Sequence, residues 1–131
     1  IEAQFGKEEI LEAYINQIPG VGQVVVVGDK MPYLSALVTL DPENLEPLAE
    51  AAGVKVGSLE ALAKEPAVVD YLMQRVQERC NAKVARYQTI KKIRVLPVEF
   101  SVDGGELTPT MKTKRNVVNQ KYAGEIEQLY E

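Results

Sequence analysis

The chain has 131 residues, of which 46% are hydrophobic and 26% charged, a balance typical of one folded domain with its own core. It excludes disordered and collagen-like chains, and no apolar run approaches the roughly 18 residues of a membrane span. The single cysteine, Cys80, excludes an intramolecular disulfide, and the absence of histidine excludes Ser-His-Asp catalysis, Cys-His catalysis and histidine-bound metals. Chemistry must therefore rest on carboxylates, lysine, arginine, tyrosine, backbone groups or a cofactor, and we predict no metal site.

The net charge of −4 is unevenly distributed. Residues 1–74 carry 4 basic and 12 acidic side chains, whereas residues 75–131 carry 11 basic and 7 acidic ones. Such a split can mark a face for an anion, although a solvated basic helix face is the simpler explanation. Because the chain opens on Ile1 rather than Met, we expect it to be part of a longer protein.

Periodicity and turn residues predict helices around a small sheet. Apolar residues at helical spacing indicate the helices, and the valine-rich run followed by alternating residues indicates a hairpin. Asp41 and Ser58 are predicted helix caps. Without βαβ alternation the class is α+β, with a mixed or antiparallel sheet flanked by helices. The predicted elements, in chain order, are a helix over 6–18, a hairpin of strands 23–27 and 33–40, helices over 42–52, 58–62 and 66–86, a strand over 93–96, a small hairpin or glycine-rich turn over 100–107, and a helix over 113–130.

Cys80 falls on the apolar stripe of the long predicted helix. Nothing in the sequence supplies the base or cationic pocket that makes a thiol reactive. We therefore predict a small core residue rather than a nucleophile.

The strongest candidate for a site is the stretch GGELTPTMKTKR at residues 104–115. It joins a glycine-rich turn to hydroxyl side chains around a proline, and then to three cations that enter a helix. Backbone N–H groups, hydroxyls and ammonium groups together suit a phosphate or a carboxylate. The spacing excludes a Walker phosphate loop, and a plain loop with solvated lysines remains the alternative.

A second basic cluster surrounds the end of the long helix and the third strand. The acidic pI of about 5.0, the aromatic content of 6% and the absence of RNP or zinc-finger patterns argue against nucleic acid. A docking surface for another domain or for an anionic cofactor fits better. The cluster comprises Lys83, Arg86, Lys91, Lys92 and Arg94.

Three stretches resemble the small domain of long-chain fatty-acid–CoA ligases. QVVVVGDKMPYLSALV at 23–38 resembles its hairpin, ARYQTIKK at 85–92 the approach to its third strand, and GELTPTMKTKR at 105–115 its C-terminal lysine motif. The resemblance covers nearly the whole chain. It implies that residues 1–131 are a single domain, the mobile C-terminal domain of an adenylate-forming, AMP-binding enzyme, without the N-terminal domain that binds ATP and fatty acid.

This resemblance implies a two-step ligation in which one lysine of the small domain serves the first step. Lys112 matches that lysine and is the predicted catalytic residue. Met111 stands where most adenylate-forming enzymes have glycine, which favours the long-chain branch and leaves Lys114 as an alternative to Lys112. The further candidates for cofactor contacts are Gly105, Thr108, Thr110 and Lys114.

The resemblance also implies ATP, Mg²⁺ and coenzyme A as substrates or cofactors of the full-length enzyme, none held tightly by this chain. The expected partners are fatty acid, ATP, coenzyme A and the missing N-terminal domain, without nucleic acid and without a transmembrane segment. We expect a cytoplasmic enzyme, with peripheral association at the inner face of a membrane as an alternative, and an isolated chain that is inactive. The competing function is a non-catalytic regulatory or scaffold domain that binds a phosphate-bearing ligand or a protein partner.

Overall fold

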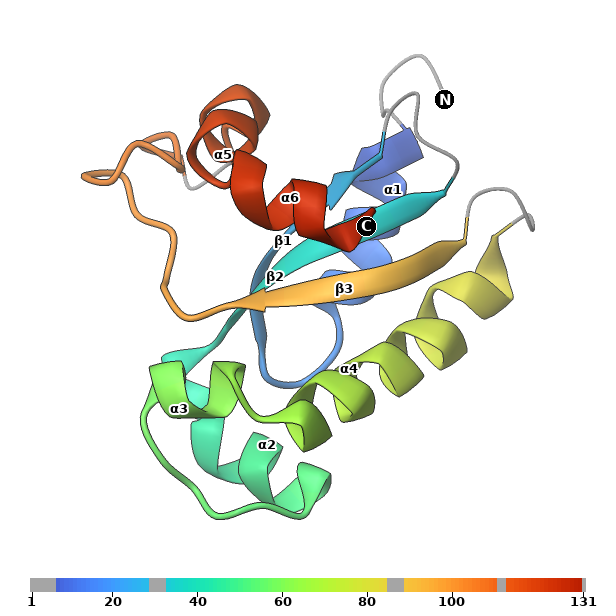
Figure 1. The fold of residues 1–131 in the computed structure, drawn as a ribbon, viewed down its shortest axis with the longest axis vertical. Coiled ribbons are helices and arrows are strands. Elements are labelled where there is room, and N and C mark those ends of the chain that lie inside the picture. The colour runs from blue at the N-terminus through green and yellow to red at the C-terminus, as the bar shows by residue number, and fades with distance from the viewer. Residues whose placement is uncertain (1–6, 29–32, 85–88, 111–112, 131) are drawn as a thin grey trace.

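The computed structural model describes residues 7–28, 33–84, 89–110 and 113–130. Helices cover both faces of a small sheet (Figure 1). In chain order the elements are α1 (Lys7–Asn16), β1 (Val21–Val27), β2 (Leu34–Leu40), the 3₁₀ turn η1 (Pro42–Asn44), α2 (Leu45–Ala52), α3 (Leu59–Ala63), α4 (Pro66–Arg79), the 3₁₀ turn η2 (Asn81–Lys83), β3 (Ile90–Leu96), α5 (Arg115–Lys121) and α6 (Ala123–Leu129).

The sheet has the order β1-β2-β3 and is mixed. β1 and β2 form the predicted antiparallel hairpin, with Val25 opposite Leu37. β2 and β3 run parallel, with Ala36 opposite Ile93. The α+β class and the mixed sheet are confirmed, but the expectation of no βαβ connection is wrong. Parallel neighbours need a long crossover, and the helices between β2 and β3 provide it.

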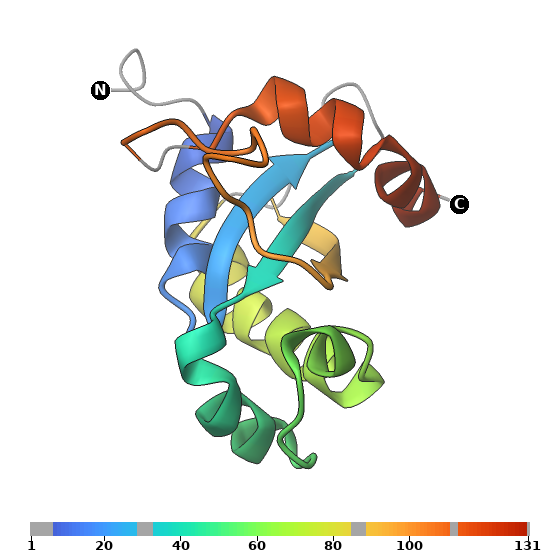
Figure 2. The same ribbon diagram turned by 90° about the vertical axis from the view of Figure 1, so that its left-hand side faces the viewer.

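The larger apolar cluster lies between the sheet and the helices of the first two thirds of the chain. α1 and α4 cover this face, as Figures 1 and 2 show. Buried strand residues such as Val24 and Val38 point into it. The helical residues buried there are Leu11, Ile15, Leu48, Ala49, Leu62, Ala63, Val68, Leu72 and Val76.

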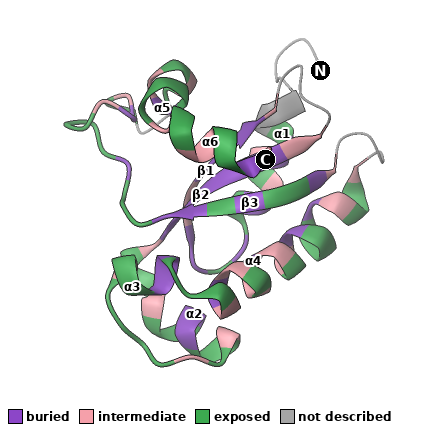
Figure 3. Ribbon diagram, viewed as in Figure 1, coloured by how far each residue is buried: buried purple, intermediate pink, exposed green. Residues whose placement is uncertain are grey.

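The opposite face of the sheet carries a smaller cluster beneath α5 and α6. In Figure 2, α5 lies above the strands and α6 to their right. Figure 3 shows that the buried residues concentrate on the strands and on the inner faces of the helices. Alternate strand residues face this cluster because successive side chains of a strand point to opposite faces. Its buried members are Val25, Val27, Leu37, Leu96, Phe100, Leu107, Val118 and Leu129.

Both predicted caps are confirmed. Asp41 Oδ1 accepts from the Glu43 N–H at 3.0 Å, and Ser58 Oγ accepts from the Ala61 N–H at 3.1 Å. Each supplies an acceptor to an N–H group that the first helical turn leaves unpaired.

Two predicted helices are shorter than expected. α4 ends at Arg79, because the Asn81 side chain bonds both the N–H and the carbonyl of Ile90 and so ties the chain to β3. The predicted helix over 113–130 divides at Tyr122, which has φ −113° and ψ 27° and packs its ring against Phe100. Tertiary contacts therefore determine where α4 ends and where the C-terminal helix divides. β3 begins at Ile90 rather than at residue 93.

Cys80 is fully buried in the larger cluster, as predicted. Its Sγ lies 3.9 Å from the Leu11 carbonyl oxygen, and burial raises the pKa of its thiol to about 11. The thiol is therefore protonated at neutral pH and inert.

Candidate functional site

The predicted motif lies in the segment that connects β3 to α5. Residues 102–105 form a turn, so the glycine-rich turn is confirmed and the alternative of a hairpin over 100–107 is not. The Gly105 N–H donates to the Val102 carbonyl at 3.1 Å, and Gly105 has φ +90°, which residues with a Cβ rarely adopt. The positive φ at this position of the turn therefore explains why residue 105 is a glycine.

The acidic residue after the turn is buried. Glu106 is 2% exposed, and its carboxylate accepts from the Ser101 N–H at 3.0 Å and pairs with Lys121 on α5. Burial raises the pKa of Glu106, but the hydrogen bonds from Lys121 and Ser101 outweigh it and hold the pKa below its ordinary value. The same bond to Glu106 raises the pKa of Lys121. Both groups are therefore charged at neutral pH.

Gly104 leaves the space that this carboxylate occupies. A Cβ at residue 104 would lie 2.5 Å from Glu106 Oε1 and 2.9 Å from Ser101 Oγ. The Gly104 N–H also donates to Ser101 Oγ at 2.8 Å. The two glycines thus have different roles, one for conformation and one for close approach.

The loop that follows Glu106 is closed at its base. Leu107 and Thr113 pair in one antiparallel bridge, and the Lys114 N–H donates to the Glu106 carbonyl at 2.7 Å. The Leu107 side chain is buried in the smaller cluster. The bonds hold the two ends of the loop side by side.

The predicted site residues are distributed along this segment. The hydroxyls of Thr108 and Thr110 lie 3.0 Å apart, and the exposed Lys114 directly precedes α5. Gly105 lies in the preceding turn. Lys112 falls outside the described residues. The catalytic and cofactor-binding roles of these residues remain predictions.

Arg115, the first residue of α5, links three elements. Its guanidinium bonds Glu12 Oε1 of α1 at 2.6 Å and the Val26 carbonyl of β1 at 3.4 Å. Glu12 Oε2 in turn accepts from the Val26 N–H at 2.8 Å. β1 is an edge strand, and these side chains satisfy both outward-facing backbone groups of Val26.

Sequence reasoning gave no role of their own to Glu106, Lys121 or Glu12. It included Arg115 only as one of the three cations that enter a helix. The available signal was the acidic residue between two glycines and an apolar leucine, ahead of a basic stretch. The Glu12–Arg115 pair spans 103 residues, and periodicity carries no signal over that separation.

Residues 8–131 match the family model described as the C-terminal domain of AMP-binding enzymes. The chain belongs to this family. It is 42% identical over 125 residues to the long-chain-fatty-acid–CoA ligase FadD15 of Mycobacterium tuberculosis, covering 92% of this chain and 20% of that protein. It is 35% identical over 139 residues to the long-chain-fatty-acid–CoA ligase ACSBG1 of Mus musculus, covering 93% of this chain and 19% of that protein.

Solved structures show the same fold. The A-PCP didomain of carboxylic acid reductase from Segniliparus rugosus, in complex with AMP, matches with a TM-score of 0.73 and 25% identity, over 94% of this chain and 16% of that one. The adenylation domain of a carboxylate reductase from Mycobacterium chelonae matches with a TM-score of 0.63 and 30% identity, over 92% of this chain and 17% of that one. The chain thus spans about a fifth of the length of the curated relatives named above.

The second basic cluster divides into two groups. Lys91, Lys92 and Arg94 are exposed on the edge strand β3, and Lys92 Nζ lies 5.6 Å from the centroid of the Tyr33 ring. Lys83 Nζ instead lies 5.5 Å from the Tyr14 ring centroid. Arg86 falls outside the described residues. The edge strand β3 therefore carries three of the cations, whereas Lys83 lies apart from them beside Tyr14.

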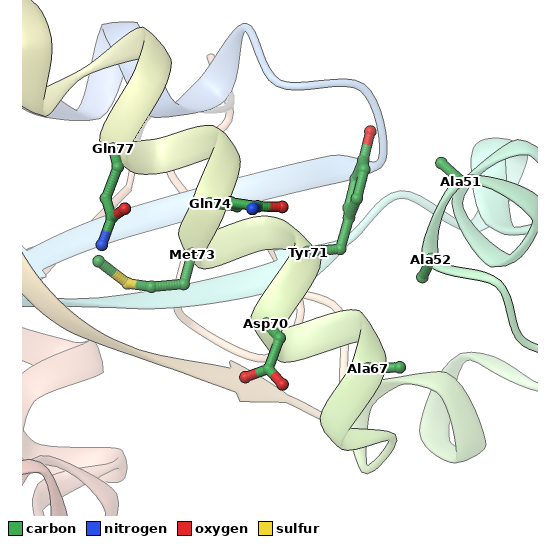
Figure 4. Close-up of a pocket in the computed structure, with 8 residues that line it drawn as sticks. All are labelled: Ala51, Ala52, Ala67, Asp70, Tyr71, Met73, Gln74 and Gln77. Carbon is green, nitrogen blue, oxygen red and sulfur yellow. The ribbon is translucent and has the colours of Figure 1, made fainter.

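A cavity of about 490 Å³ lies between α2 and α4 (Figure 4). Tyr71 stands on the side of α4 toward Ala51 and Ala52, whereas Met73 and Gln77 lie toward its other side. Among the described residues that line it, the charged one is Asp70. A carboxylate does not suit a phosphate ligand.

The described part of the chain offers neither a cluster of metal ligands nor a membrane-spanning helix. Among these residues no three His, Cys, Asp or Glu side chains come together as a metal cluster. Their helices include none that is long and apolar enough to cross a membrane.

Proposed function

We propose that this chain is the C-terminal domain of an ATP-dependent long-chain fatty-acid–CoA ligase, with Lys112 as its catalytic residue. The supporting observation is the 42% identity to a long-chain-fatty-acid–CoA ligase over 92% of the chain, including the GELTPTMKTKR motif. The residues that bind ATP and fatty acid belong mainly to an N-terminal domain outside these 131 residues. We expect the chain alone to be inactive.

In the first step a carboxylate oxygen of the fatty acid attacks the α-phosphorus of ATP. A P–O bond forms, the bond to pyrophosphate breaks, and acyl-adenylate and pyrophosphate result. In the second step the sulfur of coenzyme A attacks the acyl carbon and loses its proton, and AMP leaves. The product is the acyl thioester.

Lys112 serves the first step. Its ammonium is a compact cation, suited to a point where carboxylate and phosphate oxygens converge. It aligns the two anions and offsets the negative charge that develops as the new bond forms. The small domain then turns for the thioester step, so that Lys112 leaves the reacting centre. Magnesium accompanies ATP, and we assign it no ligand from the described residues.

The closed base of the 107–113 loop supports this role. The Leu107–Thr113 bridge and the bond from Lys114 to Glu106 hold the chain at both sides of the lysine. Thr113 is its covalent neighbour and is half-buried. The described residues on both sides of Lys112 are therefore bonded to the rest of the domain.

The test is Lys112→Ala in the full-length ligase, with the two half-reactions assayed separately. By analogy with the loss of one oxyanion donor, we expect acyl-adenylate formation to fall about 10²–10³-fold. Thioester formation from supplied acyl-adenylate and coenzyme A should persist. The matched control, Lys114→Ala, removes an exposed cation of the same loop. Normal adenylation by the Lys112 variant would refute the assignment, and loss in the Lys114 variant alone would transfer the role to Lys114.

The solved-structure matches favour one second candidate, adenylation followed by transfer to a carrier protein. The carboxylic acid reductase structure, of which this chain matches 16%, is an A-PCP didomain. The two candidates share the first step and differ in the thiol acceptor. Thioester formation with free coenzyme A supports the ligase, whereas adenylation without it supports the carrier-dependent enzyme.

A further inference from the structure

We propose that two ion pairs, Glu106–Lys121 and Glu12–Arg115, position the lysine loop for adenylation. The proposal rests on the proposed function of Lys112. It concerns residues that flank the loop and act through it, and none of the four is proposed to touch substrate.

The first pair holds the entry of the loop. Glu106 is 2% exposed, and its carboxylate binds the Ser101 N–H and Lys121, while its carbonyl accepts from the Lys114 N–H. One residue therefore bonds Ser101 before the turn, Lys121 of α5 and Lys114 at the exit of the loop. Displacing it would release all three contacts.

The second pair holds the exit. Arg115 directly follows Lys114, and its side chain is 32% exposed beside a Glu12 side chain that is 16% exposed. Glu12 and the Val26 backbone belong to α1 and β1, which pack together in the body of the domain. The start of α5 is thus bonded to elements far away in sequence.

The polar character of these anchors matters because apolar packing is not directional. Leu107 and Val118 fill the layer beneath the loop, and their packing excludes water without requiring a particular bond angle. Charge-assisted hydrogen bonds require both distance and angle. The two pairs therefore specify where the loop ends lie, and a displacement of about 1 Å at a reacting group can cost 10²-fold in rate.

The test uses Glu106→Gln, Glu12→Gln and Arg115→Gln in the full-length ligase. Each should lower the adenylation rate constant about 10-fold while leaving thioester formation from supplied acyl-adenylate within about 2-fold. Because Glu12 and Arg115 act as one contact, the Glu12→Gln/Arg115→Gln double variant should lose no more than the worse single variant. Lys121→Gln, on the exposed side of its pair, tests the same contact if Glu106→Gln does not fold.

Val76→Ala is the matched control. Val76 is buried in the larger cluster on α4, so the substitution destabilises the domain without touching the loop anchors. It should leave the ratio of the two half-reactions unchanged. The inference fails if the anchor variants keep that same ratio, or if the two single losses multiply in the double variant. Lys112→Ala, measured alongside, separates this failure from failure of the proposed function, which would show as normal adenylation by that variant.

Discussion

The two faces of the sheet are stabilised by different means. The face covered by α1 and α4 is an apolar cluster continuous from the first helix to β3. The face beneath α5 and α6 has the smaller cluster and adds ion pairs and tyrosine hydroxyl bonds. Tyr33 donates to the Leu129 carbonyl at 2.7 Å, and Tyr130 donates to the Tyr33 carbonyl at 2.9 Å.

The two faces therefore contribute differently to the stability of the fold and to the position of the candidate loop. The larger cluster contains most of the buried apolar residues. Their burial drives folding, but it is not directional and so does not by itself specify the orientation of neighbouring groups. The smaller face carries the candidate loop, and its polar contacts specify geometry at a modest net gain in free energy. Substitutions on the larger face should therefore mainly change the free energy of unfolding, and those on the smaller face should also change the geometry of the loop.

The largest expected effect comes from a cavity in the larger cluster. Leu72→Ala should lower the free energy of unfolding of the 131-residue chain by about 3–5 kcal/mol, because α4 is packed on a continuous core that cannot close the gap. Leu107→Ala, equally buried at 1% exposure, should lower it by about 2 kcal/mol, because the smaller cluster around Leu107 can close more of the gap. Urea denaturation measures both, and equal losses would contradict the distinction between the faces.

A smaller effect is expected from Glu106→Gln, and it should depend on pH. The pKa of Glu106 is lower in the folded chain than its ordinary value of 4.5, so its charge stabilises the fold above pH 4.5. That contribution is lost as the pH falls from 4.5 through the folded pKa. The variant should therefore be about 1–3 kcal/mol less stable at pH 7, with a difference that narrows below pH 4.5.

Urea midpoints at pH 7 and pH 3.5 (roughly one unit below the ordinary carboxyl pKa) measure this dependence. The control is Glu60→Gln, which removes an ion pair with Lys64 whose side chains are 66% and 68% exposed. The Glu60→Gln substitution should change the urea midpoint little at either pH, because the ion pair is exposed to solvent. A Glu106 variant whose deficit stays constant with pH would exclude the ionised pair as its source.

The smallest expected effect compares two glycines with positive φ. Gly53 ends α2 at φ +76° with open space around it, and Gly105 lies before the loop at φ +90°. Replacing either glycine by alanine should lower the free energy of unfolding by about 1 kcal/mol, because both backbone conformations are strained for a residue with a Cβ. Only Gly105→Ala should also lower adenylation in the full-length ligase. Equal adenylation by the two variants would show that the turn before Glu106 does not influence the loop.

Local patterns predicted where most helices and strands lie, but not where each of them ends. Valine-rich alternation predicted the hairpin, Asp41 and Ser58 predicted helix starts, and the stripe on α4 predicted the burial of Cys80. These features depend on residues close in sequence, whose backbone preferences and side-chain periods are readable directly. The family likewise followed from residues adjacent in the motif.

The sequence by itself thus determined the elements, the class and the stretch that carries Lys112. The tertiary structure decided the parallel pairing of β2 and β3, the ends of α4, the division at Tyr122 and the partners of Glu106 and Glu12. Those features depend on groups brought together across as many as 103 residues. Contacts of that kind form only when the chain closes on itself, and no local preference encodes them.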